Sequence, residues 1–467
     1  MKKWMMIYTA IFFCICLLPF VGMAFGEDAS SKENRTLQEL PQISDENGWN
    51  VDYLQELGSY FQDHFGFRSE MVTANAKVSQ ELFRVSTADN VIVGEEGWLY
   101  YKDSLNDYLG RDQMSDRALF NVAHSLAMMQ EEVENQGCQF LFTVAPNKNS
   151  LYGEYMPYYD SVIVSNEKNL LRLPEFLEEE GVHYTDLYQM FQEKEEVLYH
   201  KRDSHWNNKG AALASQALLQ QLGEESIDWE TETCEIRCDF EGDLDTMLFP
   251  EAVTLEDEIY FDRNDVFAYV GEVESNFDPV ITTVNPSGTG SLVMYRDSFG
   301  NAILPFLANH FEDAYFSRGV PYWLTDLEIH HADTVIVERA ERFLPDMAKN
   351  PPVMQAPLSL AGAEETMVLD GAEQVMVEEM GNYWKISGFA AEEYLDTKAE
   401  IYIRFEDGSV YEAFPATMEK NGQDSDNGFI MYMEKTRMQN QDSLFEILVF
   451  ADGKWTNIYQ KGREIKG

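Results

Sequence analysis

Two short stretches, far apart in the chain, carry the side chains that serine-based acyl transfer requires. Residues 202–207 read RDSHWN, and residues 295–301 read YRDSFGN. In an extended segment, Asp203 and His205 project from the same side of the backbone, so the carboxylate can fix the tautomer of the imidazole. A neutral imidazole can take a proton from a serine such as Ser298 near pH 7. The two stretches can therefore supply an acid, a base and a nucleophile.

Each of these residues also has a simpler explanation. A histidine can be an ordinary surface or core residue, and an Asp-Ser pair such as Asp297-Ser298 is common at the N-cap of a helix. The chain has eight histidines, and only His205 combines a nearby acidic residue with a flanking Trp206 and Asn207. This combination favours the catalytic interpretation of the first stretch.

Further polar side chains at predicted strand ends are candidates for oxyanion or substrate contacts. Asn147 and Lys148 follow the apolar run at residues 139–145, and the Asn amide could complete an oxyanion hole. Arg318 follows another strand-like run and could contact the substrate, as could Trp206. The alternatives are a turn role for Asn147 and a surface salt bridge for Arg318.

A metal site is the competing interpretation of the residues around the first stretch. Its candidate ligands are His200, Asp203, His205, His330 and His331. Their spacing matches no closed zinc pattern. The chain also has no glycine-rich loop of the phosphate-binding type. We therefore expect neither a metal nor a cofactor.

Helices and strands alternate through the middle of the chain. Apolar runs predict strands at residues 139–145, 182–187, 291–295, 314–316 and 333–338, with helices at 118–135, 169–180, 210–222 and 301–311. This alternation predicts an α/β fold with a parallel sheet covered on both faces. Ligands of such folds bind beyond the carboxyl ends of the strands. Both chemical stretches precede helices, and the second follows a strand, so we expect the site at this edge.

The N-terminus has the pattern of an export signal. Lys2 and Lys3 precede a nearly unbroken apolar stretch at residues 4–25, which is long enough to span a bilayer. It can act as an uncleaved anchor, which we favour, or as a signal that is cleaved near the small residues Gly22 and Ala24. Either way, the rest of the chain is predicted to lie on the extracellular side of the cell membrane.

Shifts in composition and periodicity divide the chain. We expect an anchor at residues 1–26, a tether at 27–50, a catalytic domain at 51–345, a linker at 346–364 and a β-rich domain at 365–467. In the last part the hydrophobic period becomes two and Asp-Gly turns separate short strands, which predicts an all-β sandwich. The formal net charge of −48 would repel nucleic acid phosphates, so nucleic acid is not an expected partner.

Several strings together resemble the DHHW family, which is similar to the alginate acetylation proteins AlgJ and AlgX. The strings lie at residues 61–68, 94–99, 145–148, 203–207 and 296–300. The resemblance spans roughly residues 53–343 and implies an SGNH-hydrolase-like α/β/α sandwich. It further implies that Ser298 is the nucleophile, His205 the base and Asp203 the orienting acid. One departure is Ser204, where the family more usually has a histidine.

The resemblance also implies an activity and partners. The expected reaction is O-acetylation of hydroxyls on an exported or cell-surface polysaccharide through an acyl-serine intermediate. A membrane acyltransferase of the MBOAT type would supply the acetyl group from inside the cell. The alternatives are a carbohydrate acetyl-esterase with the same triad and a non-catalytic polysaccharide-binding or assembly protein.

Overall fold

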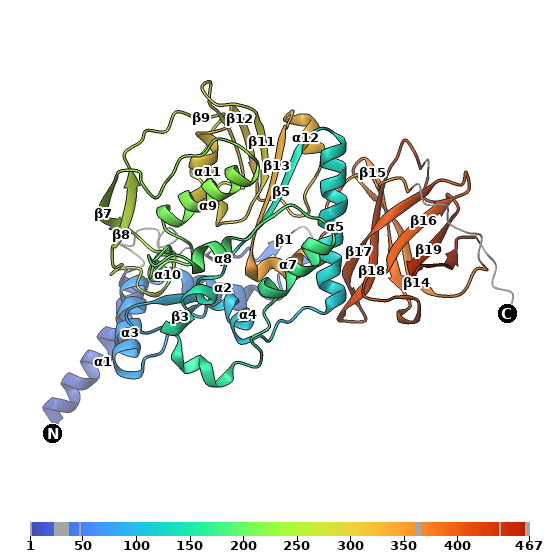
Figure 1. Cartoon of the computed structure of the whole chain (residues 1–467). Helices are drawn as coiled ribbons and strands as arrows, with labels where there is room; N and C mark the ends of the chain where they lie inside the picture. Colours follow the sequence, from blue (N-terminus) through green and yellow to red (C-terminus); the bar gives the residue numbers. More distant parts are fainter. Residues whose placement is uncertain (1, 23–36, 46–47, 360–366, 439, 463–467) are drawn as a thin grey trace.

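The structure, a computed structural model, describes residues 2–22, 37–45, 48–359, 367–438 and 440–462. An α/β domain is followed by a C-terminal β domain, which lies beside helix α5 (Asp116–Asn135) (Figure 1). Parts of the predicted tether and linker, at residues 27–36, 46–47 and 360–364, fall outside the described residues.

The α/β domain is built on one seven-stranded sheet. Its strands are β5 (Gln139–Ala145), β6 (Tyr184–Thr185), β9 (Ala268–Tyr269), β10 (Val280–Val284), β11 (Ser291–Tyr295), β12 (Asp313–Ser317) and β13 (Thr334–Ala340). The order is β6-β5-β13-β11-β12-β10-β9. The first five are parallel, as the sequence predicts, and β10 and β9 extend the sheet in antiparallel fashion.

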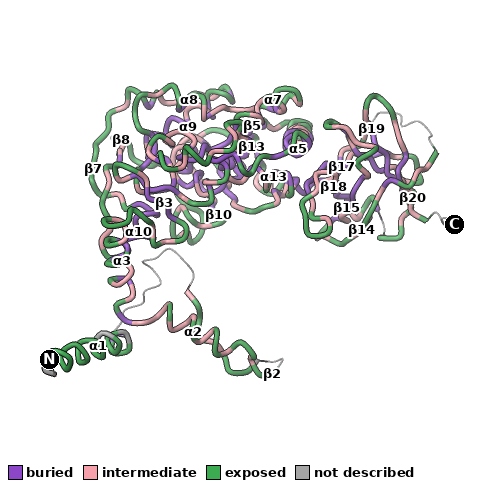
Figure 2. The backbone as a smooth tube through the Cα atoms, turned by 90° about the horizontal axis from the view of Figure 1, so that it is seen from below, coloured by how far each residue is buried: buried purple, intermediate pink, exposed green. Residues whose placement is uncertain are grey.

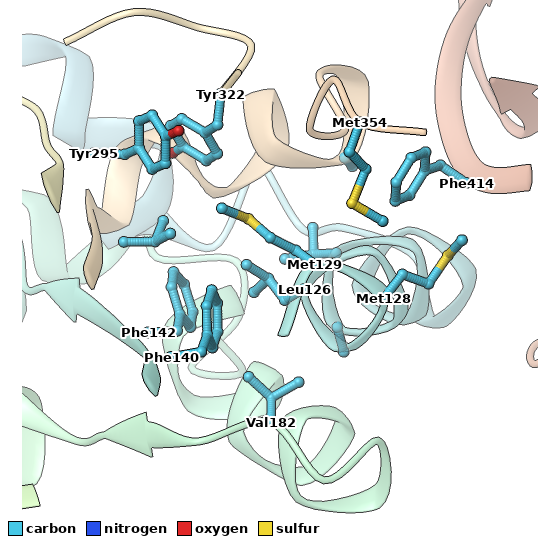
Figure 3. Packing of buried hydrophobic residues seen from close by; sticks show 14 of the residues in the cluster. Leu126, Met128, Met129, Phe140, Phe142, Val182, Tyr295, Tyr322, Met354 and Phe414 are labelled. Carbon is cyan, nitrogen blue, oxygen red and sulfur yellow. The ribbon is translucent and has the colours of Figure 1, made fainter. Parts of the chain in front are cut away.

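Helices cover both faces of this sheet because alternate strand residues point to opposite sides. On one face, Val293 and Tyr295 belong to a buried cluster with α5 and α7 (Asn169–Glu179). Figure 3 shows Leu126 and Met129 of α5 in this cluster with Phe140 and Phe142 of β5. On the other face, Leu292 and Met294 pack with α8 (Leu187–Gln192), α9 (Asn208–Gln221) and α11 (Gly300–Ala308). The result is a three-layer α/β/α arrangement.

The N-terminal part precedes these layers. Helix α1 (Lys2–Gly22) lies on the segment predicted as an anchor and extends from the body of the molecule (Figures 1 and 2). Within the residues that the structure describes, no helix reaches the length and apolarity that a membrane crossing requires.

Short elements connect this segment to the α/β domain. Two small strands, β1 (Ser44–Asp45) and β2 (Gly48–Trp49), pair before α2 (Tyr53–His64) and α3 (Arg68–Phe83). A break at residues 65–67 separates these two helices. Strands β3 (Val91–Val93) and β4 (Leu99–Tyr101) form a hairpin, and α4 (Leu105–Leu109) follows it.

The C-terminal domain is one curled antiparallel sheet, so the expected sandwich of two sheets is corrected. Its strands are β14 (Ala372–Met380), β15 (Tyr383–Ala390), β16 (Glu400–Phe405), β17 (Val410–Lys420), β18 (Gln423–Glu434), β19 (Phe445–Ala451) and β20 (Lys454–Gln460), in the order β14-β15-β18-β17-β16-β19-β20. A bulge in the long pair β17/β18 supports the curl. The backbone N–H groups of Leu369 and Gly371, just before β14, donate to carbonyls of β20, so the two edges meet.

The described part of the predicted linker, residues 346–359, includes side chains that pack against the protein. It begins within α13 (Leu344–Lys349), and Val353 and Met354 are fully buried. Met354 lies beside Phe414 of β17 (Figure 3), and both belong to the same buried cluster as Met128 of α5. The two domains therefore share one hydrophobic cluster.

Candidate active site

Ser298 lies just beyond the carboxyl end of β11, in the middle of the sheet. The preceding Asp297 is buried, and its carboxylate accepts the N–H of Phe299 at 2.9 Å and that of Ala340 at 2.7 Å. The backbone N–H of Asp297 donates to Glu338 of β13 at 3.0 Å. These bonds fix the turn, while α11 begins without a side-chain cap. The Ser298 hydroxyl is therefore not used to cap the helix.

The loop that carries Asp203 and His205 is held at both of its ends. Tyr199 and Trp206 form an isolated antiparallel bridge across it. The side chain of Asn207 caps α9 by accepting the N–H of Gly210 at 2.9 Å. Inside the loop, the buried ammonium of Lys148 donates to three backbone carbonyls, those of His200, Lys201 and Asp203.

Asp203, His205 and Ser298 form one hydrogen-bonded row. The Nδ1 atom of His205 lies 2.8 Å from Oδ1 of Asp203, and its Nε2 atom lies 2.9 Å from Oγ of Ser298. Asp203 also accepts the backbone N–H groups of His205 and Asp243, each at 2.8 Å. Such a row lets the imidazole take the hydroxyl proton while the carboxylate stabilises the imidazolium that forms.

The charges in the row favour the ionised acid and the protonated base. Burial opposes the charge on Asp203, but hydrogen bonds from His205 and from backbone N–H groups outweigh it and hold the pKa of Asp203 below its ordinary value. Burial likewise opposes the charge on His205, and the bond to Asp203 reverses that effect and raises the pKa of His205.

A second carboxylate, that of Asp243, lies beside the row and was not found by sequence reasoning. It stands at the start of α10 (Asp243–Leu248), 40 residues after Asp203. The preceding Gly242 packs against the backbone of Arg202, where a Cβ atom would come within 2.3 Å of the carbonyl oxygen. Burial, and then the charge of Asp203, raise the pKa of Asp243 to about 6.

The other predicted candidates are placed around the row in different ways. Asn147 is buried, and its amide donates to Asp107 of α4 at 3.1 Å, so its nitrogen is already engaged. Trp206 is only 2% exposed and packs against Phe299, so it is a core residue, which corrects its expected role as a substrate contact. Arg318 donates to the Phe277 carbonyl at 3.2 Å.

Arg342 is a second residue near the row that sequence reasoning missed. It follows β13, the neighbour of β11, and its guanidinium lies 5.5 Å from the ring centre of Phe299. Its buried Nε has no hydrogen-bond partner in the described part of the chain. Its positive charge opposes the net rise in the pKa of His205. The signal available in the sequence was only its place just after a predicted strand.

The five residues of the competing metal hypothesis do not form one group, because only Asp203 and His205 lie together. His200 bonds Glu258 at 3.0 Å and stacks on Phe240. His330 stacks on Tyr315, in the turn that precedes β13. Within the described residues, the one group of three His, Cys or acidic side chains with ligand atoms inside 4.8 Å is Asp203, His205 and Asp243. Because Asp203 and His205 bond each other, we assign this group to the hydrogen-bonded row.

Comparisons with known proteins agree with the resemblance drawn from the motifs. Residues 91–251 match the family model ALGX, described as the SGNH hydrolase-like domain of the acetyltransferase AlgX. This confirms the family resemblance and the SGNH-like α/β fold. The matched segment contains Asn147, Lys148, Asp203 and His205 but ends before Ser298. No curated protein matches the sequence.

Solved structures that match this chain include PatB1 of Bacillus cereus, with 16% identity and a TM-score of 0.42, covering 54% of this chain and 96% of that one. A DHHW family protein from Eubacterium siraeum has 16% identity and a TM-score of 0.41, covering 54% of this chain and 94% of its own. AlgX of Pseudomonas aeruginosa has 13% identity and a TM-score of 0.39, covering 80% of this chain and 94% of its own.

Proposed function

We propose that this protein is an O-acetyltransferase that acetylates hydroxyl groups of an exported polysaccharide through an acyl-serine intermediate. The observation that carries the proposal is the hydrogen-bonded row of Asp203, His205 and Ser298 at the carboxyl edge of the sheet. The match of residues 91–251 to the acetyltransferase family model supports acetyl as the acyl group.

The first half-reaction loads the serine. Nε2 of His205 takes the proton of the Ser298 hydroxyl as Oγ attacks the carbonyl carbon of an acetyl ester. The backbone N–H of Ser298 has no acceptor within the described residues, so it can donate to the oxyanion of the tetrahedral intermediate. His205 then returns the proton to the departing oxygen as the ester bond breaks, and acetyl-Ser298 remains.

The second half-reaction delivers the acetyl group. A sugar hydroxyl attacks the acetyl-serine carbonyl while His205 takes its proton. The bond to Oγ of Ser298 breaks, and the proton returns to that oxygen. The enzyme is restored and an O-acetylated sugar leaves, without a cofactor. Asp203 holds the imidazole in the required tautomer through both steps.

Export and the donor complete the proposal. Lys2, Lys3 and the apolar segment after them would direct the domain to the outer side of the cell membrane, with the segment kept as an anchor. A membrane acyltransferase of the MBOAT type would bring the acetyl group across, because an extracellular domain has no access to cytoplasmic acetyl donors. Cell fractionation of the full chain tests this placement directly.

The experiment for the activity compares the full chain with its Ser298→Ala variant. Both are incubated with an acetyl ester, with and without an oligosaccharide acceptor, and products and protein are analysed by mass spectrometry. We expect acetylated sugar and an acetyl group on Ser298 from the wild type alone. Acetate without any acetylated sugar would instead establish an esterase. Equal activity of both proteins, or none from either across several esters, would reject Ser298 as nucleophile and favour a binding protein.

A further inference from the structure

The carboxylate of Asp243 is joined to the row through the hydroxyl of Ser204. Oγ of Ser204 donates to Oδ2 of Asp243 at 2.6 Å, and it lies 3.1 Å from Nδ1 of His205. The N–H of Nδ1 is thus shared between Oδ1 of Asp203, at 2.8 Å, and the Ser204 oxygen. The second carboxylate itself comes within 3.8 Å of Nδ1.

Asp243 is held rigidly in this place. Its Oδ1 atom accepts the N–H of Ser204 at 2.8 Å and its own neighbour's N–H, that of Leu244, at 2.7 Å. Its backbone N–H in turn donates to Oδ2 of Asp203 at 2.8 Å. The two acids and the serine therefore form a closed set of hydrogen bonds around one side of the imidazole.

We propose that Asp243 is a second orienting carboxylate for His205, acting through the hydroxyl of Ser204. The proposal deepens the proposed function and rests on it. An unpolarised serine hydroxyl would be a weak acceptor for the imidazole N–H. Because the Ser204 proton is committed to Asp243, the lone pairs of Oγ face Nδ1 and strengthen the acceptor. When His205 takes the proton of Ser298, this arrangement places a second negative charge near the imidazolium.

Asp243 is a positioning residue, because its hydrogen bonds reach His205 through Ser204 and its own carboxylate stays 3.8 Å from Nδ1. Other charged or titratable groups interact with it: Asp203 and His205 in the row, the Lys148 ammonium and the Tyr101 hydroxyl of β4. Arg342 acts on His205 with the opposite sign. All of these groups are kept in Asp243→Asn, and the loss of the Asp243 charge is expected to lower the pKa of His205.

The test uses five variants of the full chain: Asp243→Asn, Ser204→Ala, the double variant of these two, Ser204→Thr and, as a matched control, Asp257→Asn on the exposed part of β8 (Glu256–Phe261). The pKa of His205 is measured by NMR titration of ¹³C-histidine-labelled protein, with His205→Asn identifying the signal. The pH profile of kcat/KM is measured with an acetyl ester, and thermal unfolding checks the fold.

We expect Asp243→Asn and Ser204→Ala to lower the pKa of His205 by about half a pH unit or more. The acid limb of kcat/KM should move down with it, and kcat should fall about 3- to 10-fold with little change in KM. Ser204→Thr, which keeps the hydroxyl, should have the wild-type pKa of His205 and the wild-type kcat. Asp257→Asn should change neither the pKa nor kcat. The double variant Asp243→Asn/Ser204→Ala should lose no more kcat than Asp243→Asn alone, because Asp243 and Ser204 act as one unit.

Two results would overturn the proposal. One is a pKa of His205 that is the same in Asp243→Asn as in the wild type. The other is a loss of kcat in Ser204→Ala that Ser204→Thr does not restore while both variants remain folded. The NMR measurement needs no turnover, so a protein that is inactive on every ester yet shows the shift would reject the proposed function and keep the role of Asp243.

Discussion

His205 lies among groups whose charges act on it in opposite directions. Asp203 raises the pKa of the imidazole through a direct hydrogen bond, and Asp243 adds to this, whereas Arg342 lowers it. A general base must be neutral before it can accept a proton, so the balance of these groups sets the pH at which activity begins. The imidazole of His205 packs edge to face with the ring of Phe299, with ring centres 4.8 Å apart. This contact holds the plane of the imidazole while its charge changes.

We predict that Arg342→Met moves the acid limb of kcat/KM to higher pH. Removing the guanidinium removes a charge that disfavours the imidazolium, so the pKa of His205 rises and less neutral base is present near pH 6. The expected shift is about half a pH unit, with little effect above pH 8. Arg342→Lys keeps a positive charge and is the control. A limb that stays in place or moves to lower pH in Arg342→Met would contradict the prediction.

At the scale of elements, Lys148 connects the end of β5 to the loop that carries Asp203 and His205. It opens α6 (Lys148–Leu151), directly after β5, and its ammonium is buried beneath the carbonyls of residues 200, 201 and 203. Burial lowers the pKa of Lys148 to about 8. The sequence pointed to Lys148 as an oxyanion or substrate candidate, whereas its contacts are those of a residue that shapes the loop.

Lys148→Met should therefore damage both stability and activity. The variant leaves three backbone carbonyls without their donor, which we expect to cost about 2–4 kcal/mol of unfolding free energy and to lower kcat at least tenfold. Urea unfolding and ester turnover measure the two effects. Lys201→Met is the matched control, because it removes the same charge from an exposed side chain of the same loop. Wild-type activity in Lys148→Met would show that the loop keeps its active conformation without the Lys148 ammonium.

Sequence patterns predicted the elements whose burial is complete and missed those that depend on distant partners. Strands β5 and β11 lie within the predicted bounds because nearly every residue is apolar and buried. The antiparallel β9 and β10 carry no such run, since both are partly exposed and β9 is the edge strand of the sheet. The turn carrying Asp243 could not be connected to His205 from the sequence, because only the folded chain brings Gly242 against Arg202.

At the scale of the whole molecule, the two domains are joined by packing and by charge. Strands β17 and β18 pack on α5. The buried cluster between them contains Phe414 and Tyr432 of the β domain and Met128 of the helix. Beside this apolar contact, the imidazole of His124 lies between two carboxylates. Its Nδ1 atom is 2.7 Å from Glu180 of the α/β domain, and its Nε2 atom is 2.8 Å from Glu412 of β17. A protonated His124 therefore links the domains.

The pH dependence of this link gives the last prediction. Burial opposes the charge on His124, but the two carboxylates outweigh it and raise its pKa to about 9, against an unfolded value of about 6.5. A raised pKa means that the folded state binds the proton more tightly, so the stabilisation is complete below about pH 6.5 and disappears as the pH rises through 9.

His124→Gln should therefore lower the unfolding free energy by about 2–3 kcal/mol at pH 6 and by much less at pH 10. Urea unfolding of the full chain at pH 6, 8 and 10 measures this difference. His183→Gln is the control, because that side chain is 58% exposed and lies 3.4 Å from a single carboxylate. A difference between wild type and His124→Gln that stayed constant with pH would mean that His124 contributes packing alone, and that the apolar contact of α5 with β17 holds the domains together without help from charge.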